Sequence, residues 1–188
     1  DQIFEEATVK HLVELCKSHQ VIVFTHRLSL LAAIEKFARK ESMRPHIVAF
    51  ERGAWCGEPS ELPLLIQNPK SAITKLLELV KKARKVLNES STEEYEIHAQ
   101  GICSSFRNTL QRVIEYDLLS EVVQRFDSDI HAKNITKLSA ISPEDCKILD
   151  DLMTEYSKYM HPQSYETPVS LPLPDQLQAD LEKLKEWR

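Results

Sequence analysis

The chain of 188 residues is long enough for one substantial domain or two small ones, and its 42% of hydrophobic residues is ample for a core. The net charge of -5 gives no general attraction to nucleic acid, although it does not exclude binding through a local basic patch. No apolar run approaches the ~20 residues of a membrane span, and residues 1–6 do not read as a signal peptide, so we expect a cytoplasmic protein without a membrane partner.

Cysteine and glycine usage narrows the chemistry further. The four cysteines are widely scattered, without a CxxC pair or a histidine at zinc-ligand spacing, so we expect reduced thiols and no metal site. Three glycines are few against an average usage of about 7%, which favours a mostly helical chain. The sequence therefore also lacks any Gly-rich loop that could hold a phosphate.

The first elements alternate between helix and strand. Residues 3–18 predict an amphipathic helix with an inner stripe of Ile3, Ala7, Leu12, Leu15 and Cys16. Residues 20–25 predict a strand, because a continuous Val/Ile/Phe run is typical of strands covered on both faces in α/β sheets. This run ends on Thr25 and His26, at the strand end where such sheets bind ligands. A helix over 28–40 follows.

A second strand is expected at residues 46–50, after Pro45 ends the preceding helical pattern. Residues 51–53 predict a turn in which Gly53 takes a positive φ, and residues 54–56 run back as a short partner strand. This order of elements indicates an α/β fold, of which residues 1–66 form the C-terminal end of a sheet rather than a complete one.

Residues 67–188 predict a mainly α-helical module. Helices are expected at 71–87, 93–120, 121–137, 143–160 and 174–187, with a polar linker at 88–92 and an extended, proline-rich connector at 161–174. Ser142 and Pro143 are typical of a helix start. The inward positions are expected to be Ile73, Leu76, Leu77, Val80, Ala83 and Leu87 in the first helix, and Ile97, Ile102, Phe106, Leu110, Val113 and Ile114 in the second.

Four elements of the first 66 residues, in the same order, resemble the C-terminal piece of an ABC-type ATPase domain. This superfamily includes transporters, recombination proteins and chromosome-maintenance ATPases. Asp1 falls where the D-loop aspartate stands, and residues 21–26 match the strand that ends on the switch histidine. Residues 46–50 match the next strand, and Gly53 with the Gly-Glu-Pro-Ser-Glu-Leu run at 57–62 matches the closing turn and element.

The resemblance implies that the full-length protein hydrolyses ATP with Mg²⁺. His26 would be the switch histidine that contacts the nucleotide, and Asp1 would reach across the interface with an ATPase dimer partner. The sequence holds no Gly-x-x-x-x-Gly-Lys-Ser/Thr loop and no signature motif, so we expect the chain to bind no ATP alone and to be the C-terminal part of a longer ATPase. The alternative for His26 is a satisfied histidine at a strand end.

Residues 67–188 are loosely similar to the C-terminal region of bacterial ATPases related to the anticodon-nuclease family, which serve in phage defence or restriction. The resemblance implies a nucleic acid (tRNA or DNA) or an effector protein as partner, and Arg107 and His161 as nuclease residues, with Glu115 and Arg112 as further candidates. Gln111 departs from the expected Arg-x-x-x-Glu spacing. The alternatives are a partner-recruiting module without chemistry, an arginine on a solvated helix face, and a histidine favoured by a helix C-terminus.

Overall fold

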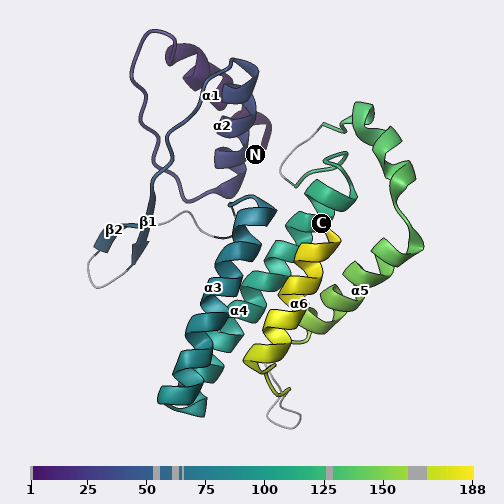
Figure 1. Ribbon diagram of the computed structural model, residues 1–188. Coiled ribbons are helices and arrows are strands. Elements are labelled where there is room, and N and C mark those ends of the chain that lie inside the picture. Colours follow the sequence, from purple (N-terminus) through teal and green to yellow (C-terminus); the bar gives the residue numbers. More distant parts are fainter. Residues whose placement is uncertain (1, 53–55, 61–63, 65, 126–128, 161–168) are drawn as a thin grey trace. The chain divides into compact units, whose positions relative to one another are not determined.

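A computed structural model describes residues 2–52, 56–60, 64, 66–125, 129–160 and 169–188 (Figure 1). The chain divides into two compact units. The N-terminal unit comprises Asp1–Leu62 with Gln124–Ile130, and the helical unit comprises Pro63–Val123 with His131–Arg188. In the described ranges, no helix is both long enough and apolar enough to span a bilayer.

The N-terminal unit has a small core between two helices, α1 (Gln2–Leu15) and α2 (Leu28–Lys40). Its buried residues are Val9 and Val13 of α1, and Ala33 and Ala38 of α2. The bounds of α2 are those that the sequence predicts, whereas the predicted inner stripe of α1 is wrong, since Ala7, Leu15 and Cys16 are exposed. Several apolar stripes compete on this helix, and packing against α2 selects the one through Val9 and Val13.

The strand predicted at residues 20–25 is absent, because residues 20–27 have no regular secondary structure. Val21 is half-buried, but the other apolar side chains of this run face solvent: Ile22 is 70% exposed and Phe24 is 84% exposed. A strand needs a neighbour to complete its hydrogen bonds, and the described residues offer this run no ladder partner. The composition predicts the preference for a strand but cannot supply the neighbouring strand.

A two-stranded antiparallel hairpin follows, formed by β1 (Ala49–Arg52) and β2 (Cys56–Ser60). Ala49 pairs with Ser60, and the register shifts between Glu51 and Arg52. The hairpin lies three residues later than the predicted strand at 46–50, and the predicted turn glycine, Gly53, lies outside the described residues together with 54 and 55. Among the described glycines, Gly57 takes a positive φ of 80°.

The helical unit begins with two long helices that pack together, α3 (Pro69–Glu89) and α4 (Thr92–Val113) (Figure 1). Polar caps start both: the Asn68 side chain accepts from the Ser71 N–H at 2.9 Å, and the Ser91 hydroxyl accepts from the Glu94 N–H at 3.2 Å. The predicted inner stripes are largely confirmed, but Ile97 is 74% exposed. The buried side of α4 runs instead through Tyr95, Ala99, Ile102, Phe106 and Leu110.

The helix predicted at 121–137 is wrong. After α4 comes a short π-helical turn, η1 (Ile114–Leu118), and then Ser120 and Glu121 take positive φ angles of 47° and 60°. Two residues in this left-handed region end any right-handed helix. A 3₁₀ helix, η2 (Ala132–Ala140), overlaps the end of the predicted helix and extends beyond it.

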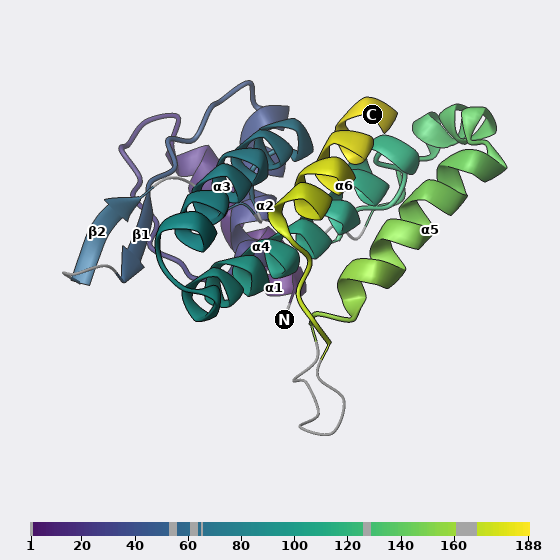
Figure 2. The same ribbon diagram turned by 60° about the horizontal axis from the view of Figure 1, so that its bottom comes forward.

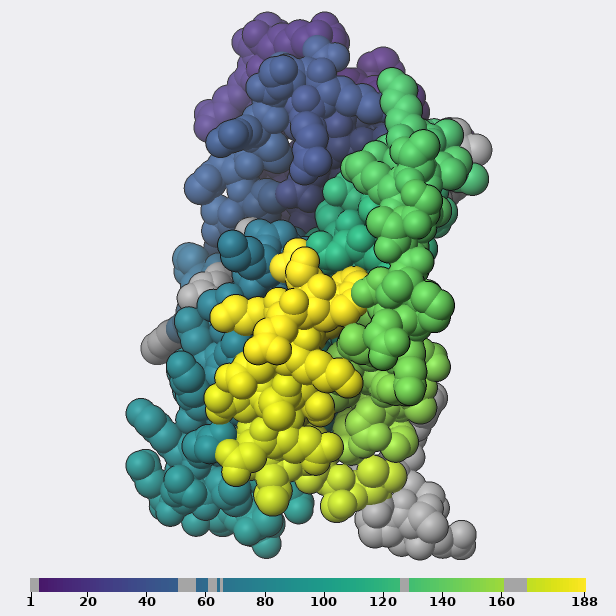
Figure 3. Space-filling view, turned by 45° about the vertical axis from the view of Figure 1, so that its right-hand side comes forward, coloured from purple at the N-terminus to yellow at the C-terminus, as the bar shows by residue number. Residues whose placement is uncertain are grey.

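Two further helices complete the bundle, α5 (Pro143–Ser157) and α6 (Pro174–Trp187), close to their predicted bounds. The predicted start of α5 is confirmed as a capping box, in which Ser142 and Asp145 each accept from the backbone N–H of the other. Figures 2 and 3 show α6 between α3 and α5, and it buries Leu177, Leu181 and Leu184. The described structure is thus mainly helical, and the α/β ATPase sheet stays a prediction.

Candidate functional site

The predicted switch residue, His26, stands at the end of an exposed apolar segment and just before α2. The His26 side chain is exposed, and the adjacent Thr25 hydroxyl oxygen accepts from the Arg27 N–H at 3.0 Å. The Arg27 guanidinium forms an ion pair with Glu5 of α1, with 2.5 Å between Nη2 and Oε1. Local contacts thus fix the backbone beside His26, while its imidazole stays accessible to a ligand from outside the described chain.

The apolar segment before His26 includes exposed large side chains of the N-terminal unit. Residues 21–24 are Val-Ile-Val-Phe, a composition with a strong preference for strands. In addition to Ile22 and Phe24, Val23 is exposed. Large contiguous exposed apolar patches are rare on monomeric proteins and are typical of interaction sites. A sheet that accepts this segment as a strand would bury these side chains and place His26 at the strand end.

Two of the other three catalytic candidates, Asp1 and His161, lie outside the described residues. The predicted D-loop contact and the predicted meeting of Arg107 with His161 are therefore both untested and stay predictions. The third, Arg107, lies within the described residues.

Within the described residues, Arg107 contacts a neighbouring helix. Its Nε donates to the Ser157 hydroxyl at 3.1 Å, and that hydroxyl donates to the Met153 carbonyl at 2.6 Å. Arg107 is partly buried and joins α4 to the end of α5. Arg112, one of the further candidates, lies over the Tyr116 ring at 5.2 Å from the centroid. These contacts are those of side chains that hold a bundle together.

Four titratable side chains of the helical unit, those of one cysteine and three tyrosines, are buried. Burial raises the pKa of the Cys103 thiol to about 12 and that of Tyr95 to about 12. Burial likewise raises the pKa of Tyr156 and of Tyr159. A thiol or phenol with so high a pKa stays protonated at neutral pH and is a poor nucleophile. These side chains pack and donate hydrogen bonds rather than react.

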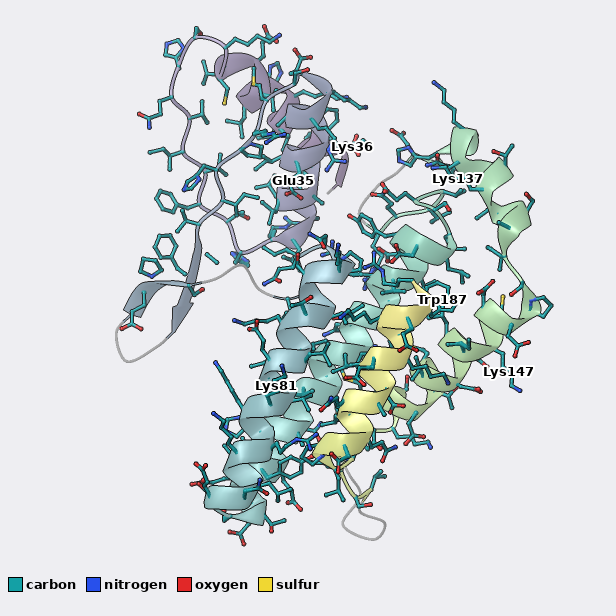
Figure 4. All side chains as sticks on the ribbon, in the orientation of Figure 1. Glu35, Lys36, Lys81, Lys137, Lys147 and Trp187 are labelled. Carbon is teal, nitrogen blue, oxygen red and sulfur yellow. The ribbon has the colours of Figure 1, made fainter. Side chains whose placement is uncertain are left out.

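Sequence reasoning missed the polar contacts that join α6 to the rest of the bundle. Tyr156 donates to Asp180 at 2.9 Å, and Trp187, labelled in Figure 4, donates from its ring N–H to Asp145 at 2.8 Å. Tyr95 donates to the Pro172 carbonyl, which fixes the segment that enters α6. Tyrosine and tryptophan with buried rings need such partners. The sequence shows these tyrosine and tryptophan residues within predicted helices, but it cannot identify the groups that accept their hydrogen bonds.

Metal-binding groups do not converge in the part of the chain that the structure describes: no three His, Cys, Asp or Glu side chains there are placed to hold an ion. No protein-family model, curated protein or solved structure matches the chain.

Proposed function

We propose that residues 1–66 complete the nucleotide-hydrolysing domain of an ABC-type ATPase that acts in a nucleic-acid-directed or phage-defence process. The observation that carries the proposal is the exposed apolar run at 21–24 that leads directly into His26, with Phe24 84% exposed. An isolated unit gains nothing from exposing such a run, whereas a sheet that accepts it as a strand removes the apolar area from water. The order of motifs around it supports an ABC-type sheet in particular.

The chemistry assigned to His26 follows from its position. During phosphoryl transfer, negative charge on the phosphate oxygens must be held while water attacks in line. An imidazole N–H at the end of a covered strand has a fixed direction and can donate to one of these oxygens. Held in this way, His26 would contact the reacting phosphate, while Thr25 and the Arg27–Glu5 pair would orient the strand end and the start of α2.

The residues of this chain fit only part of an ATP site. His26 fits as a donor to phosphate, but the sequence holds no phosphate-binding loop, and the described residues assemble no set of metal-binding carboxylates. The proposal therefore places the loop and the Mg²⁺ ligands in another segment of the complete polypeptide. It also predicts that this chain alone does not bind ATP.

The test uses the complete polypeptide and a matched pair of histidine substitutions. His26→Ala should lower kcat for ATP hydrolysis by ~10²-fold, the scale lost with a transition-state donor. His46→Ala is the control, because His46 is also exposed and in an irregular segment of the same unit. The control should keep wild-type turnover. Equal turnover in His26→Ala and wild type, with folding intact by circular dichroism, would remove His26 from the mechanism.

The structure gives no support to ribonuclease activity, the alternative that the sequence also suggests. The Arg107 Nε donates a hydrogen bond to the Ser157 hydroxyl and so joins α4 to α5. No observation in the described residues favours RNA cleavage.

A further inference from the structure

Three lysine side chains converge on one aromatic ring in the N-terminal unit. The Nζ atoms of Lys10, Lys36 and Lys40 lie 5.1, 5.7 and 5.2 Å from the centroid of Phe37. Lys10 comes from α1, and the other three residues belong to α2. Since all three nitrogens surround one centroid, no two of them are more than about 11 Å apart. We call Lys10, Lys36 and Lys40 the lysine cluster.

The positive charge of this cluster is only partly compensated. Lys36 forms an ion pair with Asp129, with 3.0 Å between Nζ and Oδ2. Lys10 and Lys40 are exposed and form no ion pair within the described ranges of the chain. The electron-rich face of the Phe37 ring attracts the ammonium groups and offsets part of their mutual repulsion. The fold thus holds two or three positive charges together at a solvent-accessible position, which is the charge arrangement that an anion needs.

The region around the cluster carries charges of both signs. Arg39 and Arg44 follow on α2 and on the turn after it, and both are exposed. Glu35 is exposed on α2, and Glu6 and Glu14 stand four residues on either side of Lys10 along α1. Two of the neighbouring carboxylates, Glu14 and Glu41, form ion pairs with Lys17. Because the whole chain carries a net charge of -5, any attraction of a polyanion must come from such a local patch.

We propose that the lysine cluster binds the phosphodiester backbone of a nucleic acid strand. The three ammonium nitrogens lie at most about 11 Å apart, so they can contact about two or three neighbouring phosphates of one strand. Ammonium groups on flexible stems contact phosphates as point charges and do not read base edges by paired hydrogen bonds. The binding is therefore independent of base sequence. It goes beyond the ATPase assignment and does not rest on it, because the contact needs no nucleotide and no sheet.

The experiment measures fluorescence anisotropy of a labelled single-stranded DNA of mixed sequence, titrated with the full 188-residue chain at about 50 and 200 mM salt. The affinity should be in the range of non-specific binding, with a Kd of ~10⁻⁶–10⁻⁴ M, and log K should fall against log salt with a slope of about -2 for three phosphates on a single strand. Lys10→Gln with Lys40→Gln should weaken binding by ~10-fold or more at the lower salt and reduce the slope by about 1.4.

The matched control removes the same charge elsewhere. Lys81 and Lys85 are exposed on α3, and Lys81 is labelled in Figure 4. Lys81→Gln with Lys85→Gln should leave the Kd within about 2-fold of wild type, because it changes only the net charge. Circular dichroism checks that both double variants keep their helices. Retained affinity in the control with loss in the cluster variant supports the proposal.

Four results would overturn it: no binding at the lower salt, an equal loss in both double variants, a larger loss in the α3 variant, or affinity without salt dependence. Two competitors, compared with unlabelled DNA, distinguish a nucleic acid ligand from other anions. Unlabelled DNA should displace the probe, whereas poly-glutamate at equal charge and inorganic phosphate should displace it far less. Stronger displacement by poly-glutamate would assign the cluster to an acidic protein, and displacement by phosphate at equal concentration would assign it to a small anion.

Discussion

The hydrogen bond from Tyr156 to Asp180 joins α5 to α6, so its removal tests how the helical unit is held together. The Tyr156 side chain is fully buried, and its ring packs on Phe106 with 4.3 Å between centroids. Tyr156→Phe keeps this packing but removes the hydroxyl that donates to Asp180 at 2.9 Å. A hydrogen bond to a charged group contributes about 1.5–3 kcal/mol, and Asp180 is partly exposed, so we expect a loss of about 1 to 1.5 kcal/mol in the free energy of unfolding.

The same bond gives this loss a pH dependence of known sign. Burial raises the pKa of Asp180, while the hydrogen bond from Tyr156 opposes that rise. Because the folded state holds the proton more tightly than the unfolded chain, this group lowers stability as pH rises above its ordinary pKa of 3.8. Removing the hydroxyl takes away the contact that favours the carboxylate. Tyr156→Phe should therefore cost more stability at neutral pH than near pH ~4.

Urea unfolding at the two pH values measures both the loss of stability and its pH dependence. The fluorescence of Trp187 reports the unfolding, because its ring N–H donates to Asp145 of α5 in the folded state. A Trp55→Phe background confines the signal to the helical unit, which matters because two units need not unfold in one step. Tyr116→Phe is the matched control and should change stability by less than about 0.5 kcal/mol. A cost of Tyr156→Phe below about 0.5 kcal/mol at both pH values, or a larger cost at the lower pH, would refute this reasoning.

Two further predictions concern the helical unit. Ser142→Ala removes the cap of α5 and should cost about 1 kcal/mol of unfolding free energy in the same urea assay, and an unchanged midpoint would contradict the role of the capping box. Cys103 is buried and its pKa is raised to about 12, so it should react with a thiol reagent only after unfolding, while the exposed Cys16 and Cys146 react at once. Equally fast labelling of Cys103 in native buffer, read by mass spectrometry, would show that its site opens.

The sequence predicts those parts of the fold that depend on local interactions. Helix α2, the start of α5 at Ser142 and the whole of α6 lie where propensity, capping and apolar spacing indicate. Each of these signals acts between residues a few positions apart. The left-handed residues Ser120 and Glu121, which end the helical run after α4, carry no such signal because neither is glycine or asparagine.

The errors arise where the outcome depends on distant parts of the chain. The apolar run before His26 has the composition of a strand, but a strand also requires a neighbour. The buried side of α1 is decided by contact with α2, and Ile97 is exposed because packing selects the opposite side of α4. The lysine cluster shows the same limit. The spacing of Lys36, Phe37 and Lys40 is visible in the sequence, but the approach of Lys10 from α1 is a tertiary contact.

Hydrogen–deuterium exchange at the backbone amides of residues 21–24 tests most directly whether this unit completes an ATPase sheet. In the 188-residue chain alone these amides should exchange as fast as those of an unstructured peptide, because the segment is irregular and exposed. In the complete polypeptide, pairing with sheet neighbours should slow their exchange by ~10²-fold or more. Equally fast exchange in the chain and in the complete polypeptide would contradict the assignment.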